Sequence, residues 1–103
     1  MKFINNSNDL SKFLCVEIKK NVPIKSISTD TRTLRKGSLF IAIKGNNFDG
    51  NDHIFTAIKK GASIVMTDRR KFKDSKDKKI VYVPNSIRAL KKISKNIINS
   101  YKG

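Results

Sequence analysis

Acidic residues, cysteine and histidine are scarce in this sequence. Its 103 residues include 8 Asp and Glu against 23 Lys and Arg, which gives a formal net charge of +15. The single cysteine, Cys15, cannot form an internal disulfide, which fits a reducing compartment. His53 is the only histidine, and no neighbouring spacing of Ser, Cys or carboxylates marks a triad or a metal site. We therefore expect no catalytic and no metal-binding residues in this chain.

Long apolar runs are also missing. No run approaches the length of about 20 residues that a membrane-spanning helix requires. The first residues, Met1–Asn6, lack the apolar core of a signal peptide, so we expect a cytoplasmic location. A hydrophobic fraction of 38% in 103 residues predicts one folded domain over residues 1–103, with one modest core.

The excess of positive charge admits two interpretations. It can indicate a nucleic-acid or anionic-membrane partner, or lysine can simply be the default surface residue of this sequence. The basic residues are spread over the whole chain and are not interleaved with exposed aromatic residues as in a single-strand stacking platform. Nucleic-acid binding is therefore the less favoured interpretation, although a positive surface would assist the capture of any phosphorylated ligand.

The first half of the chain predicts one helix and two strands. Asn5–Leu14 has the pattern of a short helix that Ser7 or Asn8 can cap. Ile24–Ser28 alternates apolar and polar residues, which indicates a short strand. Leu39–Ile43 is apolar without alternation, so we expect a strand with both faces covered.

The second half predicts two more strands and two helices. A helix over Asn51–Lys60, capped by Asn51 or Asp52, is followed by Gly61 at the position after its C-cap. Strands are expected over Ala62–Met66 and Lys79–Val83, with a charged loop over 67–78 between them. A long final helix follows, capped by Asn85 or Ser86, and its apolar stripe comprises Ile87, Leu90, Ile93, Ile97 and Tyr101. The aromatic residues expected in the core are Phe40, Phe55 and Tyr82.

The order of these elements defines the fold class. A helix between two strands favours a parallel crossover, here between Ile43 and Ala62. We therefore predict a single small α/β domain, with a mixed or mostly parallel sheet of about four to five strands and flanking helices.

Residues 28–50 hold the densest cluster of polar chemistry in the chain. The polar segment Thr29–Arg32 leads to a turn at Lys36-Gly37, and the buried strand that follows runs into the polar loop Gly45–Gly50. Two polar loops joined by one apolar strand suit the binding of a polar ligand at one end of a sheet. This pair of loops is the candidate site.

The glycines of the second loop have the spacing of a phosphate-binding P-loop, but the sequence departs from it at the decisive place. A P-loop continues with Lys and then Ser or Thr, whereas Gly50 is followed by Asn51-Asp52, and Asp49 would repel a polyphosphate. We expect Gly45 and Gly50 to permit positive φ in a tight turn. The amides of Asn46-Asn47 are then available for uncharged polar groups.

The first loop and Phe48 leave alternatives open. Asp30 and Arg32 can brace the loop while the hydroxyls of Thr29 and Thr31 contact a ligand, or they can form an ordinary turn. A carboxylate ligand could instead pair with Arg32. Phe48 can stack on a planar ring or anchor the loop in the core.

The composite pattern resembles the N-terminal domain of the Mur ligases, the ATP-dependent ligases that build the stem peptide of peptidoglycan. It consists of Ser28–Arg32, then Lys36–Gly45, then Asn47–Gly50, then Ala57–Ala62, and the resemblance extends over about residues 24–100. The form of these motifs is most similar to the MurF type, the UDP-N-acetylmuramoyl-tripeptide–D-alanyl-D-alanine ligase, with the MurE type second. Asn51–His53 departs from the family's usual His-Asp-Phe at this place.

The resemblance implies a role as the domain that holds the UDP end of a UDP-N-acetylmuramoyl-peptide. It implies substrate contacts at Thr29, Thr31, Asn46, Asn47 and Phe48, with loop support from Asp30, Arg32, Gly45, Asp49 and Gly50. Uracil is neutral and planar, so amides and hydroxyls suit it. ATP and magnesium would be bound by a central domain of the parent chain, so we expect no cofactor here and no ligation by this domain alone. The alternatives are a MurE-type domain, a basic nucleic-acid-binding domain, and a non-catalytic relative that binds proteins.

Overall fold

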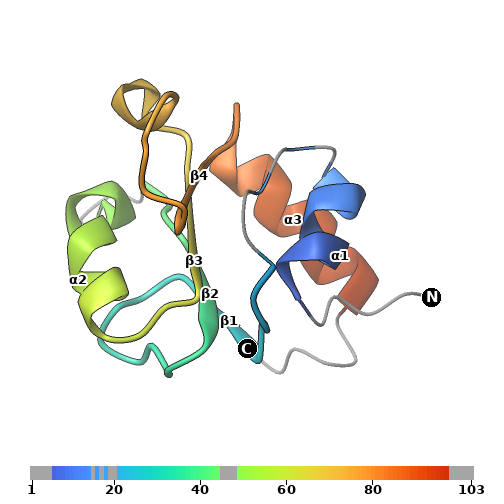
Figure 1. The fold of residues 1–103 in the computed structure, drawn as a ribbon, viewed down its shortest axis with the longest axis horizontal. Coiled ribbons are helices and arrows are strands. Elements are labelled where there is room, and N and C mark those ends of the chain that lie inside the picture. Colours follow the sequence, from blue (N-terminus) through green and yellow to red (C-terminus); the bar gives the residue numbers. More distant parts are fainter. Residues whose placement is uncertain (1–5, 15, 17, 19–20, 45–48, 98–103) are drawn as a thin grey trace.

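The computed structural model describes residues 6–14, 16, 18, 21–44 and 49–97 (Figure 1). The elements are α1 (Ser7–Leu14), β1 (Ser26–Ser28), β2 (Ser38–Ile41), α2 (Ile54–Lys59), β3 (Ile64–Thr67), β4 (Ile80–Tyr82) and α3 (Ser86–Ile97). Two 3-10 turns, Gly50–His53 and Arg70–Phe72, are added to them. The predicted order of helices and strands is confirmed, and the predicted boundaries differ by a few residues.

The sheet is parallel throughout its described strands. Its four strands lie in the order β1-β2-β3-β4. Ser28 pairs with Phe40, Phe40 with Val65, and Val65 with Ile80, so one register line crosses the whole sheet. The predicted α/β class is thereby confirmed, and the sheet corresponds to the parallel form of the prediction rather than the mixed one.

Helices cover both faces of the sheet, as the apolar strand over residues 39–43 predicted. In Figure 1, α2 lies on one face, and α1 and α3 lie on the other. Leu39 and Ile41 of β2 belong to the core cluster that includes Leu10 and Ile93, whereas Phe40 packs in the cluster under α2. This alternation divides the core into two layers, because successive side chains of a strand point to opposite faces.

The C-terminus of α2 fixes the amino edge of the sheet. Gly61 has a φ of 103°, and its N–H donates to the carbonyl of Ile58 while that of Ala62 donates to Ala57. These two bonds form a Schellman motif, which confirms Gly61 as the residue after the C-cap. The carbonyl of Gly61 accepts from the N–H of Gly37, whose φ of 86° confirms the turn before β2.

Helix starts depart from the predicted caps in two of three cases. The side chain of Asn6 accepts from the N–H of Asp9 at α1, in place of Ser7 or Asn8. Asp49 caps the 3-10 turn that precedes α2, in place of Asn51 or Asp52. Asn85 accepts from the N–H of Arg88, as predicted for α3. The sequence offers several adjacent cap-forming residues at the first two starts, and only the path of the preceding chain selects one.

Two apolar side chains lie outside the core that the sequence predicted. Phe55 is 65% exposed, because Ile54 and Ala57 form the buried face of α2 and Phe55 lies about 100° around the helix. Ile87 is 45% exposed, and the buried residues among those of α3 whose side chains are described, 86–93, are Ser86, Ala89 and Ile93. Tyr82 is half-buried, and the side chains of Ile97 and Tyr101 lie outside the described set.

Gly50 serves a different purpose from the one predicted. Positive φ occurs at Gly37 and Gly61 among the described glycines, and not at Gly50. A Cβ at Gly50 would lie 2.8 Å from the backbone nitrogen of Ile43 and 3.0 Å from Cα of Ala42. The glycine is therefore required for close backbone approach, whereas Gly45 lies outside the described residues.

Replacing Gly50 by alanine tests this close approach. We expect Gly50→Ala to lower the free energy of unfolding by about 1–3 kcal/mol, because the backbone of residues 42–43 must shift to admit the methyl group. Urea denaturation of the 103-residue chain measures the loss. Lys59→Ala, an exposed helical control, should stay within about 0.5 kcal/mol of the parent. Equal stability of Gly50→Ala and the parent would contradict the account.

Candidate functional site

The two predicted loops both leave the carboxyl edge of the parallel sheet. The segment that begins at Thr29 follows β1, and the segment from Ile43 to Gly50 follows β2. A third segment, Asp68-Arg69, follows β3 at the same edge. Ligands of open α/β sheets bind outside the carboxyl ends of the strands, so the fold places these loops where a ligand site is expected.

A compact turn follows β1. The carboxylate of Asp30 accepts from the N–H of Arg32 at 2.8 Å, and the carbonyl of Asp30 accepts from the N–H of Thr33 at 3.3 Å. The hydroxyl of Ser28 donates to that same carbonyl at 2.9 Å. These contacts form an Asx turn, which fixes the course of the backbone directly after the strand.

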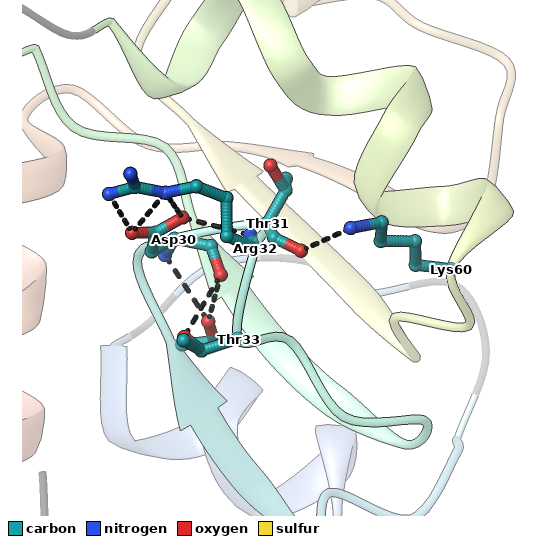
Figure 2. A network of polar contacts seen from close by, with 6 residues as sticks. Asp30, Thr31, Arg32, Thr33 and Lys60 are labelled. Carbon is teal, nitrogen blue, oxygen red and sulfur yellow. Dashed lines mark hydrogen bonds and ion pairs between the residues drawn. The ribbon is translucent and has the colours of Figure 1, made fainter.

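Asp30 and Arg32 also form a bidentate ion pair. Nη2 of Arg32 lies 2.7 Å from Oδ2 of Asp30, and Nε contacts both carboxylate oxygens (Figure 2). The hydrogen bonds from the Arg32 side chain and backbone lower the pKa of Asp30 to about 2. The Arg32 side chain is 83% exposed. The pair therefore braces the turn, and a carboxylate ligand would have to compete with Asp30 for Arg32.

The two threonines of this loop differ in exposure. Thr29 is half-buried, whereas Thr31 is 5% exposed. The carbonyl of Thr31 accepts from Nζ of Lys60 at 2.8 Å, and this bond ties the loop to the end of α2 (Figure 2). Sequence reasoning missed Lys60, because it lies 29 positions from Thr31 and resembles the many other lysines. The ligand role of the two hydroxyls stays a prediction.

The predicted contacts Asn46, Asn47 and Phe48, together with Gly45, lie outside the described residues. The base of their loop is described. Lys44 and Asp49 form an antiparallel bridge, and the N–H of Gly50 donates to the carbonyl of Ile43 at 2.8 Å. Residues 44 and 49 are therefore held side by side at the end of β2.

A closed ring of hydrogen bonds supports this base. Asp49 accepts from Nδ2 of Asn51 at 2.9 Å and from Nη2 of Arg69 at 2.9 Å. The hydroxyl of Thr67 donates to the side-chain carbonyl of Asn51 and accepts from the N–H of Arg69. The ring joins the base of the second loop to the carboxyl end of β3. The sequence predicted a supporting role for Asp49, but it gave no signal for Thr67 and Arg69, the members of the ring at the end of β3.

The charge of Asp49 is maintained within this ring. Partial burial alone would raise the pKa of Asp49, but hydrogen bonds from the backbone and side chain of Asn51, with the charge of Arg69, lower it. Asp52 contacts the same guanidinium at 3.3 Å with a side chain that is 64% exposed. The ion pair of Arg69 with Asp49 is the more buried of the two, and hence the less screened.

A separate cavity of about 500 Å³ lies along β4 at the edge of the sheet. Its lining residues include Phe72, Ile80 and Tyr82, together with the charged residues Lys73 and Asp77. It includes no residue of the predicted site. Among the described residues, we find no group of three His, Cys, Asp or Glu side chains that could hold a metal ion. No helix in the described ranges is long and apolar enough to cross a membrane.

Comparison with known proteins identifies the class of this parallel α/β domain. The family described as "Mur ligase family, catalytic domain" matches residues 23–98. The UDP-N-acetylmuramoyl-tripeptide–D-alanyl-D-alanine ligase of Rickettsia prowazekii is 40% identical over 89 residues, which are 86% of this chain and 19% of that protein. The UDP-N-acetylmuramoyl-L-alanyl-D-glutamate–2,6-diaminopimelate ligase of the same organism is 37% identical over 79 residues, 77% of this chain and 16% of that protein.

A solved structure shares the fold. The crystal structure of MurF ligase from Thermotoga maritima in complex with ADP superposes with a TM-score of 0.62 at 28% identity, and covers 77% of this chain and 18% of the other. The chain belongs to the Mur ligase family, and its fold is that of the N-terminal domain of MurF ligases. It spans less than a fifth of the length of these two relatives.

The Asp30–Arg32 pair predicts a specific pH dependence. Because the pKa of Asp30 lies near 2 in the folded chain and near 3.8 when unperturbed, its stabilising contribution is complete above about pH 4 and is lost as the pH falls towards 2. A carbon-detected NMR titration of the Asp30 carboxyl should give a midpoint near 2 in the parent and a higher one, closer to 3.8, in Arg32→Gln. The same midpoint in both proteins would contradict the pairing.

Proposed function

We propose that this chain is the substrate-binding domain of a MurF-type ligase, which holds the UDP end of UDP-N-acetylmuramoyl-tripeptide. In the whole protein, other domains would bind ATP and magnesium and join D-alanyl-D-alanine to the tripeptide in the cytoplasm. This domain would position the substrate and so lower the entropic cost of the reaction. The MurE type is the nearest alternative, because a relative of that type matches at 37% identity against 40% for the MurF type.

The observation that carries the proposal is the meeting of two polar loops at one carboxyl edge. Thr29 and Thr31 follow β1, and the segment that would provide Asn46, Asn47 and Phe48 follows β2, its neighbour in the sheet. Such an edge supplies hydroxyl, amide and backbone groups to a neutral, planar base such as uracil.

The charges at this edge support a nucleobase rather than a polyphosphate. The first arginine after β1, Arg32, and the first after β3, Arg69, are each paired with a carboxylate of the chain itself. A polyphosphate would have to displace those carboxylates, whereas a neutral base needs no free cation. The net charge of +15 would still draw an anionic UDP-sugar towards the domain.

Basic nucleic-acid binding remains the competing function, because the same net charge of +15 favours it. It predicts affinity for unrelated oligonucleotides with a steep dependence on salt. Binding through an apolar patch on α3 has less support, since Ile87 is the one large apolar side chain exposed on the described part of that helix.

Removal of single hydroxyl groups tests the proposed site. We expect Thr29→Val and Thr31→Val each to weaken binding of UDP-N-acetylmuramoyl-tripeptide about fivefold, the loss of about 1 kcal/mol that one hydrogen bond contributes. Thr33→Val is the matched control, because Thr33 lies in the same turn and is exposed. Isothermal titration calorimetry measures the three affinities, and melting temperatures check folding.

Two results would reject the proposal. The first is unchanged affinity in both Thr29→Val and Thr31→Val. The second is parent protein that binds a short duplex, but neither UDP nor the UDP-muramoyl-peptide, at about physiological ionic strength.

A further inference from the structure

Arg69 holds two loops of the carboxyl edge together from a position outside the predicted site. It follows β3 by two residues, and its guanidinium spans Asp49 and Asp52 at 2.9 and 3.3 Å. Its backbone N–H donates to the hydroxyl of Thr67 at 3.1 Å. One residue thus connects the end of β3 with the base of the loop after β2.

The connection matters because the backbone of Asp49 helps to fix the base of the loop after β2. Asp49 is the residue that bridges Lys44 and immediately precedes Gly50, whose N–H donates to Ile43. A change in the position of Asp49 would therefore shift both residues that flank the loop over 45–48. Gly50 lies so close to the backbone of residues 42–43 that even a Cβ would not fit between them.

The segment that carries Arg69 is itself anchored. Oδ2 of Asp68 accepts from the N–H of Ser86 at 3.0 Å, which fastens this segment to the first residue of α3. Ser86 and Thr67 are fully buried. The guanidinium is thus held from a fixed point, and its fork contacts Asp49 through Nη2 and Asp52 through Nη1.

We propose that Arg69 is a positioning residue for substrate binding. It acts through Asp49 by fixing the flanks of the loop after β2, and it does not touch the substrate, since both terminal nitrogens contact carboxylates of the chain. This inference rests on the proposed function, because it assigns Arg69 to the same substrate site. A ligand contact contributes more to the binding free energy when the residues that flank a loop are already fixed, because less conformational entropy is lost on binding.

The test compares three Arg69 and Asp52 variants of the 103-residue chain. We expect Arg69→Met, which keeps the apolar stem and removes the charge, to weaken binding of UDP-N-acetylmuramoyl-tripeptide at least about fivefold. Arg69→Lys restores one charge beside Asp49 and should recover part of that loss. Asp52→Asn removes only the more exposed ion pair and should change the affinity less than twofold.

A second readout follows the loop base without any ligand. Hydrogen exchange at the amides of Gly50 and Asn51 should accelerate in Arg69→Met, and exchange in β1 should stay unchanged. Ile93→Val, a buried substitution in α3 on the other side of the sheet, lowers stability without touching this ring. It should leave the affinity at the parent value, which separates positioning from general destabilisation.

The outcomes distinguish this inference from the function on which it rests. Parent protein that does not bind the UDP-muramoyl-peptide would overturn the proposed function and, with it, the assignment of Arg69. Parent protein that binds, with Arg69→Met binding equally well, would overturn the positioning role alone. Equal loss of affinity in Arg69→Met and Ile93→Val, with no recovery in Arg69→Lys, would do the same.

Discussion

Parallel pairing of all four described strands is the constraint on which the rest of this domain depends. Because every strand runs in the same direction, each must be followed by a return to the amino edge, and the segments that begin these returns gather at the carboxyl edge. The return from β1 to β2 contains no helix, and it crosses the face that α2 covers. Three contacts fix the course of its backbone. They are the Asx turn at Asp30, the hydrogen bond from Lys60 to the carbonyl of Thr31, and the hydrogen bond from the N–H of Gly37, just before β2, to the carbonyl of Gly61.

The polar groups of this edge are organised as two local systems. One is the turn of Asp30 and Arg32 after β1, and the other is the ring that joins Asp49 to Thr67 and Arg69. In each system an arginine satisfies a carboxylate of the chain. A strongly basic protein thereby presents, at this edge, two arginines whose charges are balanced by carboxylates of the chain itself.

Short-range patterns predicted much of the fold. The continuous burial of β2, the turn at Gly37 and the helix end at Gly61 depend on residues within a few positions of one another, so the sequence reveals them. The N-cap residues of the helices were harder to predict, because neighbouring residues such as Asp49, Asn51 and Asp52 all favour the N-cap position. Phe55 and Ile87 were misplaced because hydrophobicity alone does not show how wide the buried face of a short helix is.

The sequence predicted only those parts of the candidate site that consist of residues close together in the chain. The polar loops after β1 and β2 are evident in the sequence, and the fold brings both to one edge. Lys60 and Arg69, which form hydrogen bonds to these loops, are distant from them in sequence. In the sequence they look like the many other basic residues of the chain. Nothing in a single sequence separates a lysine that holds a backbone carbonyl from one that is only solvated.

The central claim is that the carboxyl edge of β1 and β2 receives a nucleobase. Intermolecular nuclear Overhauser effects between the H5 and H6 protons of uridine in bound UDP and the chain test it most directly. The account predicts cross-peaks from these ring protons to the methyl groups of Thr29 or Thr31. Cross-peaks to Ile80 or Tyr82 would instead place the nucleotide in the cavity beside β4, and would contradict the claim.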